Sequence, residues 1–154
     1  MTKSKLVRRL YDWWIANPGA AGIPDRGSFD LIEHRLLMPN VMISDVETEP
    51  FRIRYRLVGT KTVANLGVDF TGRYLDELLL PGYAVPWMEY YRMSYAERRP
   101  RMGSITDPTA SGSTFVYEFG LFPVTRGGGS EIKQFIALED YFDFELRSGV
   151  LVGL

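Results

Sequence analysis

The residues of this sequence that could most readily act as an acid or a base in catalysis are carboxylates next to tyrosines. Glu118 follows Tyr117, and Glu139 and Asp140 precede Tyr141. A carboxylate base and a tyrosine donor in an apolar pocket can transfer protons, so a small cone-shaped α+β enzyme is one candidate function. Neighbouring residues of a strand face opposite ways, so Glu118 faces outward if Tyr117 faces inward. No base, nucleophile and orienting group converge at a recognisable spacing, and we assign no catalytic residue.

Other chemistries are excluded by composition. The 154-residue chain has no cysteine and one histidine, His34. Thiolate catalysis, disulfides, iron–sulfur clusters, cysteinyl zinc sites and flavin adducts at cysteine are therefore impossible. A metal centre built from carboxylates around a single imidazole matches the usual ligand sets poorly, so we assign no metal ligand. We expect His34 to be a surface residue on a short helix.

The arginines indicate a second type of site. Arg52, Arg54 and Arg56 alternate with Phe51, Ile53, Tyr55 and Leu57, and they could form an anion or nucleic-acid surface together with Arg98, Arg99 and Arg101. Proteins that bind single strands mix stacking aromatics with basic residues on one face, whereas alternation here puts the two sets on opposite faces. The formal net charge is −1. We therefore expect solvated or carboxylate-paired arginines and no nucleic-acid partner.

Helices are predicted in four parts of the sequence. Apolar residues recur every three or four positions over 4–16, and Pro18 and Gly19 end that stretch. A short helix follows Ser28 or Asp30, with Ile32 and Leu36 on one face, and a longer helix runs from Pro86 to about Arg99. Another short helix covers 62–66. Turns and single helical turns occupy 67–82, where Gly and Pro are frequent.

Extended segments make up most of the remainder. Residues 41–46 and 51–58 have the spacing of a hairpin, and three further strands are predicted at 101–106, 114–123 and 134–142. The helices fall between the second and third strands and do not alternate with every strand. This order predicts an α+β fold with an antiparallel sheet. No segment approaches the roughly 18 consecutive apolar residues of a membrane span.

Six short motifs occur in an order that carries a family resemblance: YDWW at 11–14, IPDRGSFD at 23–30, LLMPNV at 36–41, FRIRYRLVGT at 51–60, LGVDFTGR at 66–73 and LFPV at 121–124. Together they resemble a PAS-like family of short, often free-standing bacterial domains. The resemblance runs from about residue 10 to residue 140. It implies a PAS fold, in which five antiparallel strands curl around a pocket whose other wall is made of the inserted helices.

The resemblance also implies where a ligand would bind. Aromatic side chains on the strands and the long helix could line the pocket, and tyrosine hydroxyls would supply its polar contacts. The alternative is that these rings only fill the core. PAS domains that use a flavin adduct or a hydroxycinnamoyl chromophore need a cysteine, and haem-binding ones commonly use a histidine on the long helix. Flavin adducts and haem are therefore disfavoured, and the ligand is unknown. The predicted ligand-binding residues are Tyr55, Leu57, Trp87, Tyr91, Tyr117 and Phe119.

Turn chemistry explains most of the motif residues without a ligand. The glycines stand where a strand must turn into a helix, positions that require positive φ or close backbone approach. Thr60 and Thr71 can cap the next turns, and Asp69 can pair with Arg73. The predicted structural-motif residues are Gly59, Thr60, Gly67, Asp69, Gly72 and Arg73.

The amphipathic start of the chain predicts an interface. Leu6, Leu10, Trp13 and Trp14 form a ridge too apolar to leave in water. We expect a homodimer built on this ridge, the alternative being packing on the chain's own sheet. A signalling protein could be a further partner.

The sequence thus divides into an N-terminal helical extension (1–40), a PAS-like core (41–145) and a C-terminal tail (146–154), which together form one domain. We expect a cytoplasmic sensory or regulatory domain that binds a small molecule or a protein and signals by association. We do not expect an enzyme.

Overall fold

The computed structural model describes residues 2–79, 85–108 and 114–141. Its strands form one five-stranded antiparallel sheet with the order β2-β1-β5-β4-β3. The strands are β1 (Val41–Glu47), β2 (Arg52–Val58), β3 (Arg101–Pro108), β4 (Thr114–Val124) and β5 (Gln134–Asp140), and the helices are α1 (Lys5–Ala16), α2 (Thr60–Leu66), α3 (Leu75–Leu78) and α4 (Trp87–Glu97). The α+β prediction is confirmed. The predicted tail, 146–154, lies outside the described residues.

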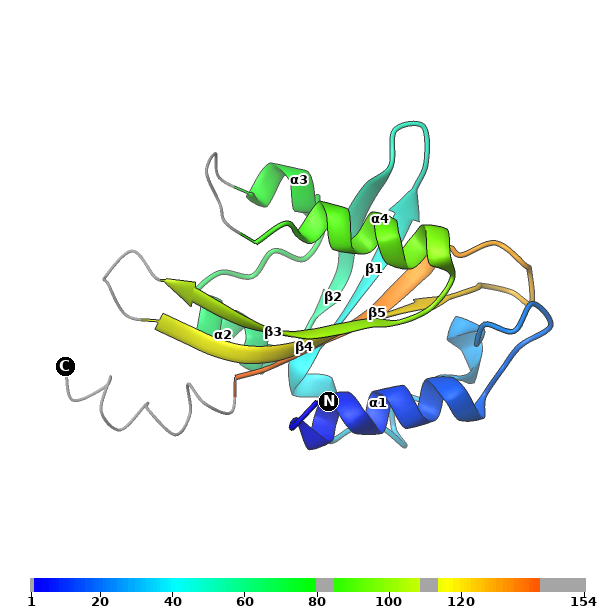
Figure 1. Ribbon diagram of the computed structural model, residues 1–154, viewed down its shortest axis with the longest axis horizontal. Coiled ribbons are helices and arrows are strands. Elements are labelled where there is room, and N and C mark those ends of the chain that lie inside the picture. The colour runs from blue at the N-terminus through cyan, green and yellow to red at the C-terminus, as the bar shows by residue number, and fades with distance from the viewer. Residues whose placement is uncertain (1, 80–84, 109–113, 142–154) are drawn as a thin grey trace.

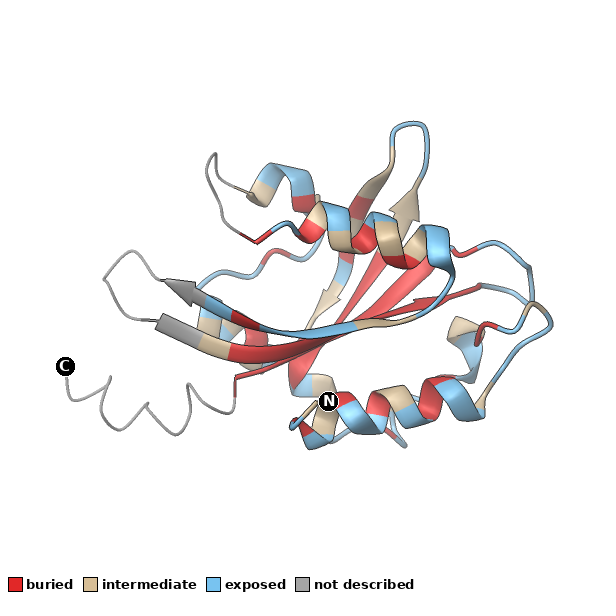
Figure 2. Ribbon diagram, viewed as in Figure 1, coloured by how far each residue is buried: buried red, intermediate tan, exposed pale blue. Residues whose placement is uncertain are grey.

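Helices lie on both sides of the sheet (Figure 1). We call the side that carries α1 the outer face and the side that carries α3 and α4 the inner face. Buried residues concentrate along the central strands and on the sides of α1 and α4 that meet the sheet (Figure 2). Every residue of β5 is buried, because this strand lies in the middle of the sheet with helices on both sides. The sheet therefore separates two environments, each enclosed by different helices.

The first helix begins at a side-chain cap. The Ser4 hydroxyl accepts a hydrogen bond from the backbone N–H of Val7 and so satisfies one of the unpaired donors at the start of α1. Val7 and Leu10 are completely buried on the side of the helix that contacts β4 and β5. The loss of apolar surface to water drives this docking. The predicted amphipathic helix is thus present, and it covers the outer face of its own sheet.

The segment that follows the first loop differs from the prediction. Residues 31–37 form consecutive turns rather than a helix, and Ile32 and Leu36 are exposed. His34, expected at the surface, is buried, with its ring stacked on Phe29 at 4.5 Å. Ile32 and Leu36 share a helical spacing, but the side of the turns that packs inward carries His34 and Leu37.

A β-bulge interrupts the hairpin of β1 and β2. Ile43 pairs with Leu57, whereas the next residue, Ser44, pairs with Tyr55, so Arg56 is the extra residue on β2. An extra residue breaks the alternation of a strand and turns the side chains beyond it to the other face. The strict alternation predicted from Phe51 to Leu57 is therefore wrong at its last residue.

Candidate functional site

A cavity of about 260 Å³ lies between the inner face of the sheet and the inserted helices. The sheet supplies residues from β1, β2, β4 and β5, and α2, α3, α4 and the adjoining turns supply the rest. Leu66 and Val68 line the cavity and are also exposed, so it reaches the surface beside them. Its lining residues are Met42, Tyr55, Leu66, Val68, Phe70, Leu75, Leu78, Leu79, Trp87, Tyr91, Tyr117, Phe119, Leu121, Ala137, Leu138, Glu139 and Tyr141.

Five of the six residues predicted to bind a ligand line this cavity: Tyr55, Trp87, Tyr91, Tyr117 and Phe119. Leu57 does not. The bulge at Arg56 turns Leu57 to the outer face, where it lines a shallow groove with Ile43. A ligand in the cavity would therefore not contact Leu57.

The aromatic rings of the cavity wall hold one another in place. Trp87 meets Phe119 edge to face at 4.9 Å between ring centroids, and Tyr55 meets Phe70 in the same way at 4.7 Å. Such edge-to-face pairs add to the stability that burial provides. Phe70 was missed by sequence reasoning because it lies among turns, where no periodicity marks the inward side chains. Leu75, Leu78 and Leu79 were missed for the same reason.

The cavity contains one carboxylate among its described lining residues, that of Glu139. Glu139 is buried and accepts a hydrogen bond from the Tyr141 hydroxyl. Burial raises the pKa of Tyr55 well above its ordinary value, and the charges of Tyr91 and Glu139 add to this effect. Burial likewise raises the pKa of Tyr91. Both phenols therefore stay protonated at neutral pH, so they can donate hydrogen bonds.

The two other carboxylates with catalytic potential lie on the opposite side of the sheet. Glu118 accepts hydrogen bonds from the backbone N–H groups of Lys3 (2.8 Å) and Ser4 (2.7 Å). Asp140, its partner across the strands, accepts one from the Ser4 hydroxyl at 2.6 Å. These two carboxylates anchor the start of α1, as the alternation of β4 predicts for Glu118. Of these three carboxylates, Glu139 is the one that lines the cavity together with Tyr117 and Tyr141, and it accepts a hydrogen bond from the Tyr141 hydroxyl.

The glycines of the motif segment have the backbone roles that their positions predict. Gly67 and Gly72 have φ angles of 79° and 85°, which favour glycine. A Cβ on Gly59 would lie 2.3 Å from the Pro39 carbonyl oxygen. Gly59 therefore allows α2 to begin directly against the turn that precedes β1.

The side-chain expectations for the same segment need correction. Thr60 is the first residue of α2 rather than its cap. The cap residue is Gly59, which has no side chain that could bond to the helix. Asp69 accepts hydrogen bonds from Thr71 and not from Arg73. The Arg73 guanidinium instead lies 3.8 Å from Glu77, one turn away. The Asp69 carboxylate accepts its hydrogen bonds from Thr71 within the same turn. Arg73 can therefore pair with Glu77 and stabilise α3.

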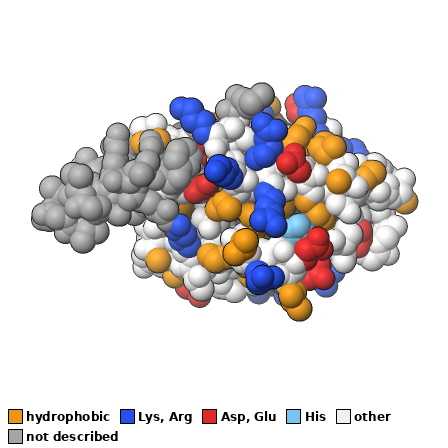
Figure 3. Space-filling view, turned by 90° about the horizontal axis from the view of Figure 1, so that it is seen from below, with side chains coloured by type: hydrophobic (Ala, Val, Ile, Leu, Met, Phe, Trp, Pro, Cys, Tyr) orange, Lys and Arg blue, Asp and Glu red, His pale blue; other side chains and the backbone are white. Residues whose placement is uncertain are grey.

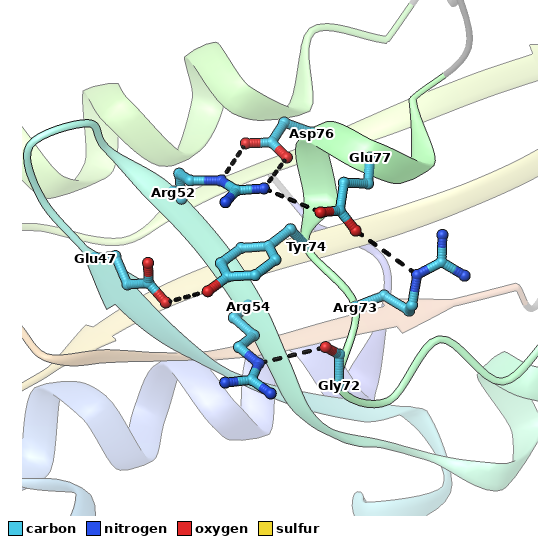
Figure 4. Close-up of polar contacts among 8 residues, drawn as sticks. All are labelled: Glu47, Arg52, Arg54, Gly72, Arg73, Tyr74, Asp76 and Glu77. Carbon is cyan, nitrogen blue, oxygen red and sulfur yellow. Dashed lines mark hydrogen bonds and ion pairs between the residues drawn. The ribbon is translucent and has the colours of Figure 1, made fainter.

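A polar network outside the cavity attaches α3 to the edge strand β2 (Figure 4). Arg52 donates to both oxygens of Asp76 at 2.8 Å and to Glu77 at 3.2 Å. Its guanidinium also lies 3.6 Å from the ring centroid of Tyr74, whose hydroxyl donates to Glu47 at 2.6 Å. The predicted pairing of the arginines with carboxylates is confirmed here. The network holds the helix whose other side forms a wall of the cavity.

The residues predicted to form a dimer interface lie mostly inside the chain. Leu10, Trp13 and Trp14 are buried, and the Trp14 Nε1–H donates to the Pro123 carbonyl oxygen at 2.8 Å. Leu6 is half-buried. The ridge therefore packs on the chain's own sheet, which is the alternative to the homodimer given above. Without the ridge, the outer face of β4 and β5 would be open to water. An interface on the outer face must use other residues.

The described residues do not favour a haem or a metal centre. His34 is buried among Phe29 and Trp13 on the outer face, and no histidine lines the described part of the cavity. No group of three potential ligands from histidine, cysteine, aspartate and glutamate occurs within 2–79, 85–108 and 114–141. In the same part of the chain, no helix is long and apolar enough to cross a membrane.

The family resemblance raises the question of whether the cavity binds a flavin. The described lining residues fit a flavin poorly. The chain has no cysteine for an adduct. Among the described lining residues there is no lysine or arginine to pair with the phosphate of a flavin mononucleotide.

Comparison with known proteins gives the fold. No protein-family model matches the sequence, and neither does any curated protein. Among solved structures, the dark structure of the blue-light photoreceptor Aureochrome1 LOV is similar with a TM-score of 0.55 and 15% identity, over 85% of this chain and 95% of that one. A light-oxygen-voltage domain studied with a flavin analogue gives a TM-score of 0.56 and 16% identity, over 82% and 94% of the two chains.

An RNA-binding light-oxygen-voltage receptor is similar as well, with a TM-score of 0.56 and 19% identity over 85% of this chain and 39% of the receptor. At these identities the likeness concerns the fold. The sheet order, the helices inserted between β2 and β3, and the cavity they enclose agree with it. The chain has the fold of PAS and light-oxygen-voltage domains.

Proposed function

We propose that this chain is a cytoplasmic sensory domain that binds a small molecule in the aromatic cavity and responds by changing its association with a second copy or a signalling protein. The cavity is the observation that carries the proposal. Ligand sites are concave and mostly apolar, with a few polar groups. Here Tyr55, Tyr91, Tyr117, Tyr141 and Glu139 supply the polar groups and apolar side chains supply the rest.

The size of the cavity limits the ligand. Pockets for drug-sized ligands measure about 300–1,000 Å³, and this cavity, at about 260 Å³, is slightly smaller. A ligand of about one ring with a short substituent would fill it. Such a ligand would contact the inner face of the sheet and both α3 and α4, so its binding would favour one arrangement of those helices.

The outer face supports the second half of the proposal. Lys and Arg side chains lie among apolar ones on the side of the molecule that carries α1 (Figure 3). Lys5, Arg8 and Arg9 of α1 are exposed, and so are Ile32 and Leu36 of the neighbouring turns, at 78% and 65%. Large apolar side chains left in water mark interaction surfaces when they gather. This surface, and not the buried tryptophan ridge, is the proposed association site.

Mass spectrometry of the purified chain tests the proposal. We expect native spectra to contain a small molecule that denaturing spectra release and identify. Ala137→Leu adds bulk directly to the cavity wall, so this variant should lose the molecule. Ala96→Leu is the matched control because Ala96 is exposed on α4 and lies outside the cavity. A wild-type protein without a bound molecule, which also binds nothing from a small-molecule library, would contradict the proposal.

A proton-transfer enzyme is the second candidate, and the Glu139–Tyr141 pair is the observation that favours it. The two candidate functions differ in what happens to the bound molecule. A sensory domain returns its ligand unchanged, whereas an enzyme releases a product. Incubation of the identified molecule with the protein, followed by mass and NMR analysis, separates the two.

A further inference from the structure

A second concave site lies on the outer face, on the other side of the sheet from the cavity. It is the groove that Ile43 and Leu57 line, and we call it the arginine groove because three separate segments contribute an arginine to it. Arg26 comes from the turn before the first strand, Arg56 from the bulge of β2, and Arg126 from the turn between β4 and β5. We infer that the arginine groove binds a small organic phosphate monoester. This inference goes beyond the proposed function, since the groove and the cavity share none of their described lining residues.

The first argument is that the backbone holds two arginines side by side. Asp25 and Thr125 form a parallel bridge, in which the Arg26 N–H donates to the Thr125 carbonyl oxygen at 2.8 Å. The Asp25 carboxylate joins the same two segments, because it accepts hydrogen bonds from the Thr125 hydroxyl at 3.0 Å and from the Gly128 N–H at 2.9 Å. Arg26 and Arg126 directly follow the bridged residues, and we call them the arginine pair. Their positions are therefore fixed before a ligand arrives, which lowers the cost of binding.

The second argument is that the arginine pair has no counter-ion within 2–79, 85–108 and 114–141. The ion pairs of this part of the chain involve other basic residues. The Arg26 guanidinium donates to the Phe29 carbonyl oxygen at 3.2 Å, which is an uncharged acceptor. Burial and the adjacent charge of Arg126 lower the pKa of Arg26, so the two like charges oppose each other. An anion between them would replace this repulsion with two attractions.

The other charged groups at the groove already have partners. Arg56 donates to the Asp45 carboxylate of the neighbouring strand. Asp25 is the one carboxylate among the described lining residues, and it also accepts a hydrogen bond from the Gly27 N–H at 3.0 Å. These hydrogen bonds, that from Gly128 above all, hold the pKa of Asp25 below its ordinary value. With Arg56 and Asp25 bonded in this way, the two charges of the arginine pair make the groove attractive to anions.

The floor of the groove indicates what else the ligand carries. Ile43 and Leu57 supply apolar surface, and Leu57 lies there because the bulge turns it to the outer face. Gln134 lines the same floor and is 5% exposed. Its Nε2 donates to Asp45 at 2.8 Å, whereas its buried Oε1 accepts no hydrogen bond from any described residue. A buried acceptor without a donor costs free energy, so a ligand hydroxyl that reaches Oε1 would add a hydrogen bond that the protein does not make.

The charge of the arginine pair favours a phosphate monoester over a carboxylate. Such a phosphate carries a charge of about −1.5 to −2 at pH 7 and three terminal oxygens, so it can pair with two guanidiniums at once. A carboxylate has a single charge and matches one guanidinium. The groove measures about 670 Å³, within the range of about 300–1,000 Å³ for small-molecule sites. It therefore has room for a ring as well as the phosphate.

Nuclear magnetic resonance titration with four compounds tests the inference: phenyl phosphate, inorganic phosphate, benzoate and benzyl alcohol. Affinity for the groove is measured from the amide shifts of Gly127 and Leu57, because a one-ring compound can also enter the cavity. We expect phenyl phosphate to bind the groove at least about tenfold more tightly than each of the other three. Equal or tighter binding of any of them would overturn the inference, and so would the absence of phenyl phosphate binding.

Variants locate the binding energy. Arg126→Gln removes one of the two guanidiniums, so the affinity for phenyl phosphate should fall at least about tenfold. The same change removes a like charge from beside Arg26, so the free protein should be at least as stable as wild type. Arg35→Gln is the matched control because Arg35 is exposed in the turns beside α1 and lies outside the groove. Unchanged affinity in Arg126→Gln, or an equal loss in Arg35→Gln, would overturn the inference.

The outcome is separate from that of the proposed function. Phenyl phosphate shifts at Gly127 and Leu57 support the inference whether or not the cavity retains a molecule. Shifts at Phe119 and Ala137 alone would place the compound in the cavity and overturn the inference, while leaving the proposed function supported. The two ideas therefore fail on different results.

Discussion

Two carboxylates on adjacent strands show that strand alternation places acidic side chains on both faces of the sheet. Glu118 of β4 points to the outer face and binds the first residues of the chain, whereas Glu139 of β5 points to the cavity. Burial tends to raise the pKa of Glu118, but its hydrogen bonds from Thr2, Lys3 and Ser4 together outweigh burial and hold the pKa below the ordinary value of 4.5. Glu118 therefore stabilises the fold in its charged form.

This lowered pKa predicts a pH-dependent stability. A carboxyl group with a lower pKa in the folded state stabilises above its unfolded pKa and loses that effect as the pH falls through the folded value. Glu118→Gln should therefore lower the free energy of unfolding by about 1–2 kcal/mol at pH 7, allowing for solvent screening. The difference from wild type should shrink below pH 4.5. Urea unfolding from pH 3 to pH 8 would measure it, and a difference that is constant across this range would contradict the assignment.

Residue-level prediction succeeded where a strand alternates without interruption and failed where it does not. Tyr117 and Phe119 face the cavity, as alternation along β4 implies. Leu57 does not, because the bulge at Arg56 leaves no trace in the pattern of apolar and polar residues. His34 was misplaced because a lone polar residue between exposed apolar ones gives no sign that it stacks on Phe29.

Among the elements, α3 is the one whose position decides the shape of the cavity. The helix has four residues, too few to be stable without tertiary contacts. Backbone hydrogen bonds join the preceding turn to β2, from Tyr55 N–H to Arg73 at 3.0 Å and from Gly72 N–H to Tyr55 at 2.7 Å. The Arg52 network completes the attachment (Figure 4).

Removal of this network should loosen one wall of the cavity. Arg52→Ala should speed hydrogen exchange at the Gly72 and Leu79 amides several-fold and leave exchange in β4 and β5 unchanged, because local openings follow local contacts. Arg56→Ala is a matched control, since Arg56 pairs with Asp45 of β1 and not with α3. Equal exchange at Gly72 in both variants would show that the network does not hold the helix.

The elements themselves were largely predictable. The strands and the two long helices begin and end within a few residues of their predicted limits, because alternation and helical spacing are strong over such lengths. The four-residue helix α3 agrees with the single helical turns predicted within 67–82. The turns over 31–37 were predicted as a helix, because tertiary packing rather than local periodicity fixes so short a segment.

At the scale of the whole molecule, the sheet has the aromatic cavity on one side and an exposed surface of basic and apolar side chains on the other. Central strand β5 contributes to both, with Glu139 in the cavity and Asp140 bound to Ser4 at the start of α1. A ligand that shifts β5 would therefore act on both sides. This arrangement gives a physical route from binding to association.

The exposed surface beside α1 should control association without affecting the cavity. Replacement of Ile32 and Leu36 with serine should abolish any ligand-dependent change in sedimentation and leave ligand affinity within about twofold of wild type, because additivity holds for distant sites. Analytical ultracentrifugation with and without ligand would measure the change. If the serine variant associates as the wild type does, the interface lies elsewhere.

The most direct test of the account is a crystal structure of the protein purified with its retained molecule. The account predicts electron density for a one-ring ligand bounded by Tyr55, Trp87 and Phe119 and within hydrogen-bond distance of the Glu139 carboxylate. Density for the molecule on the outer face, or a cavity closed by its own side chains while the molecule is bound elsewhere, would contradict the account.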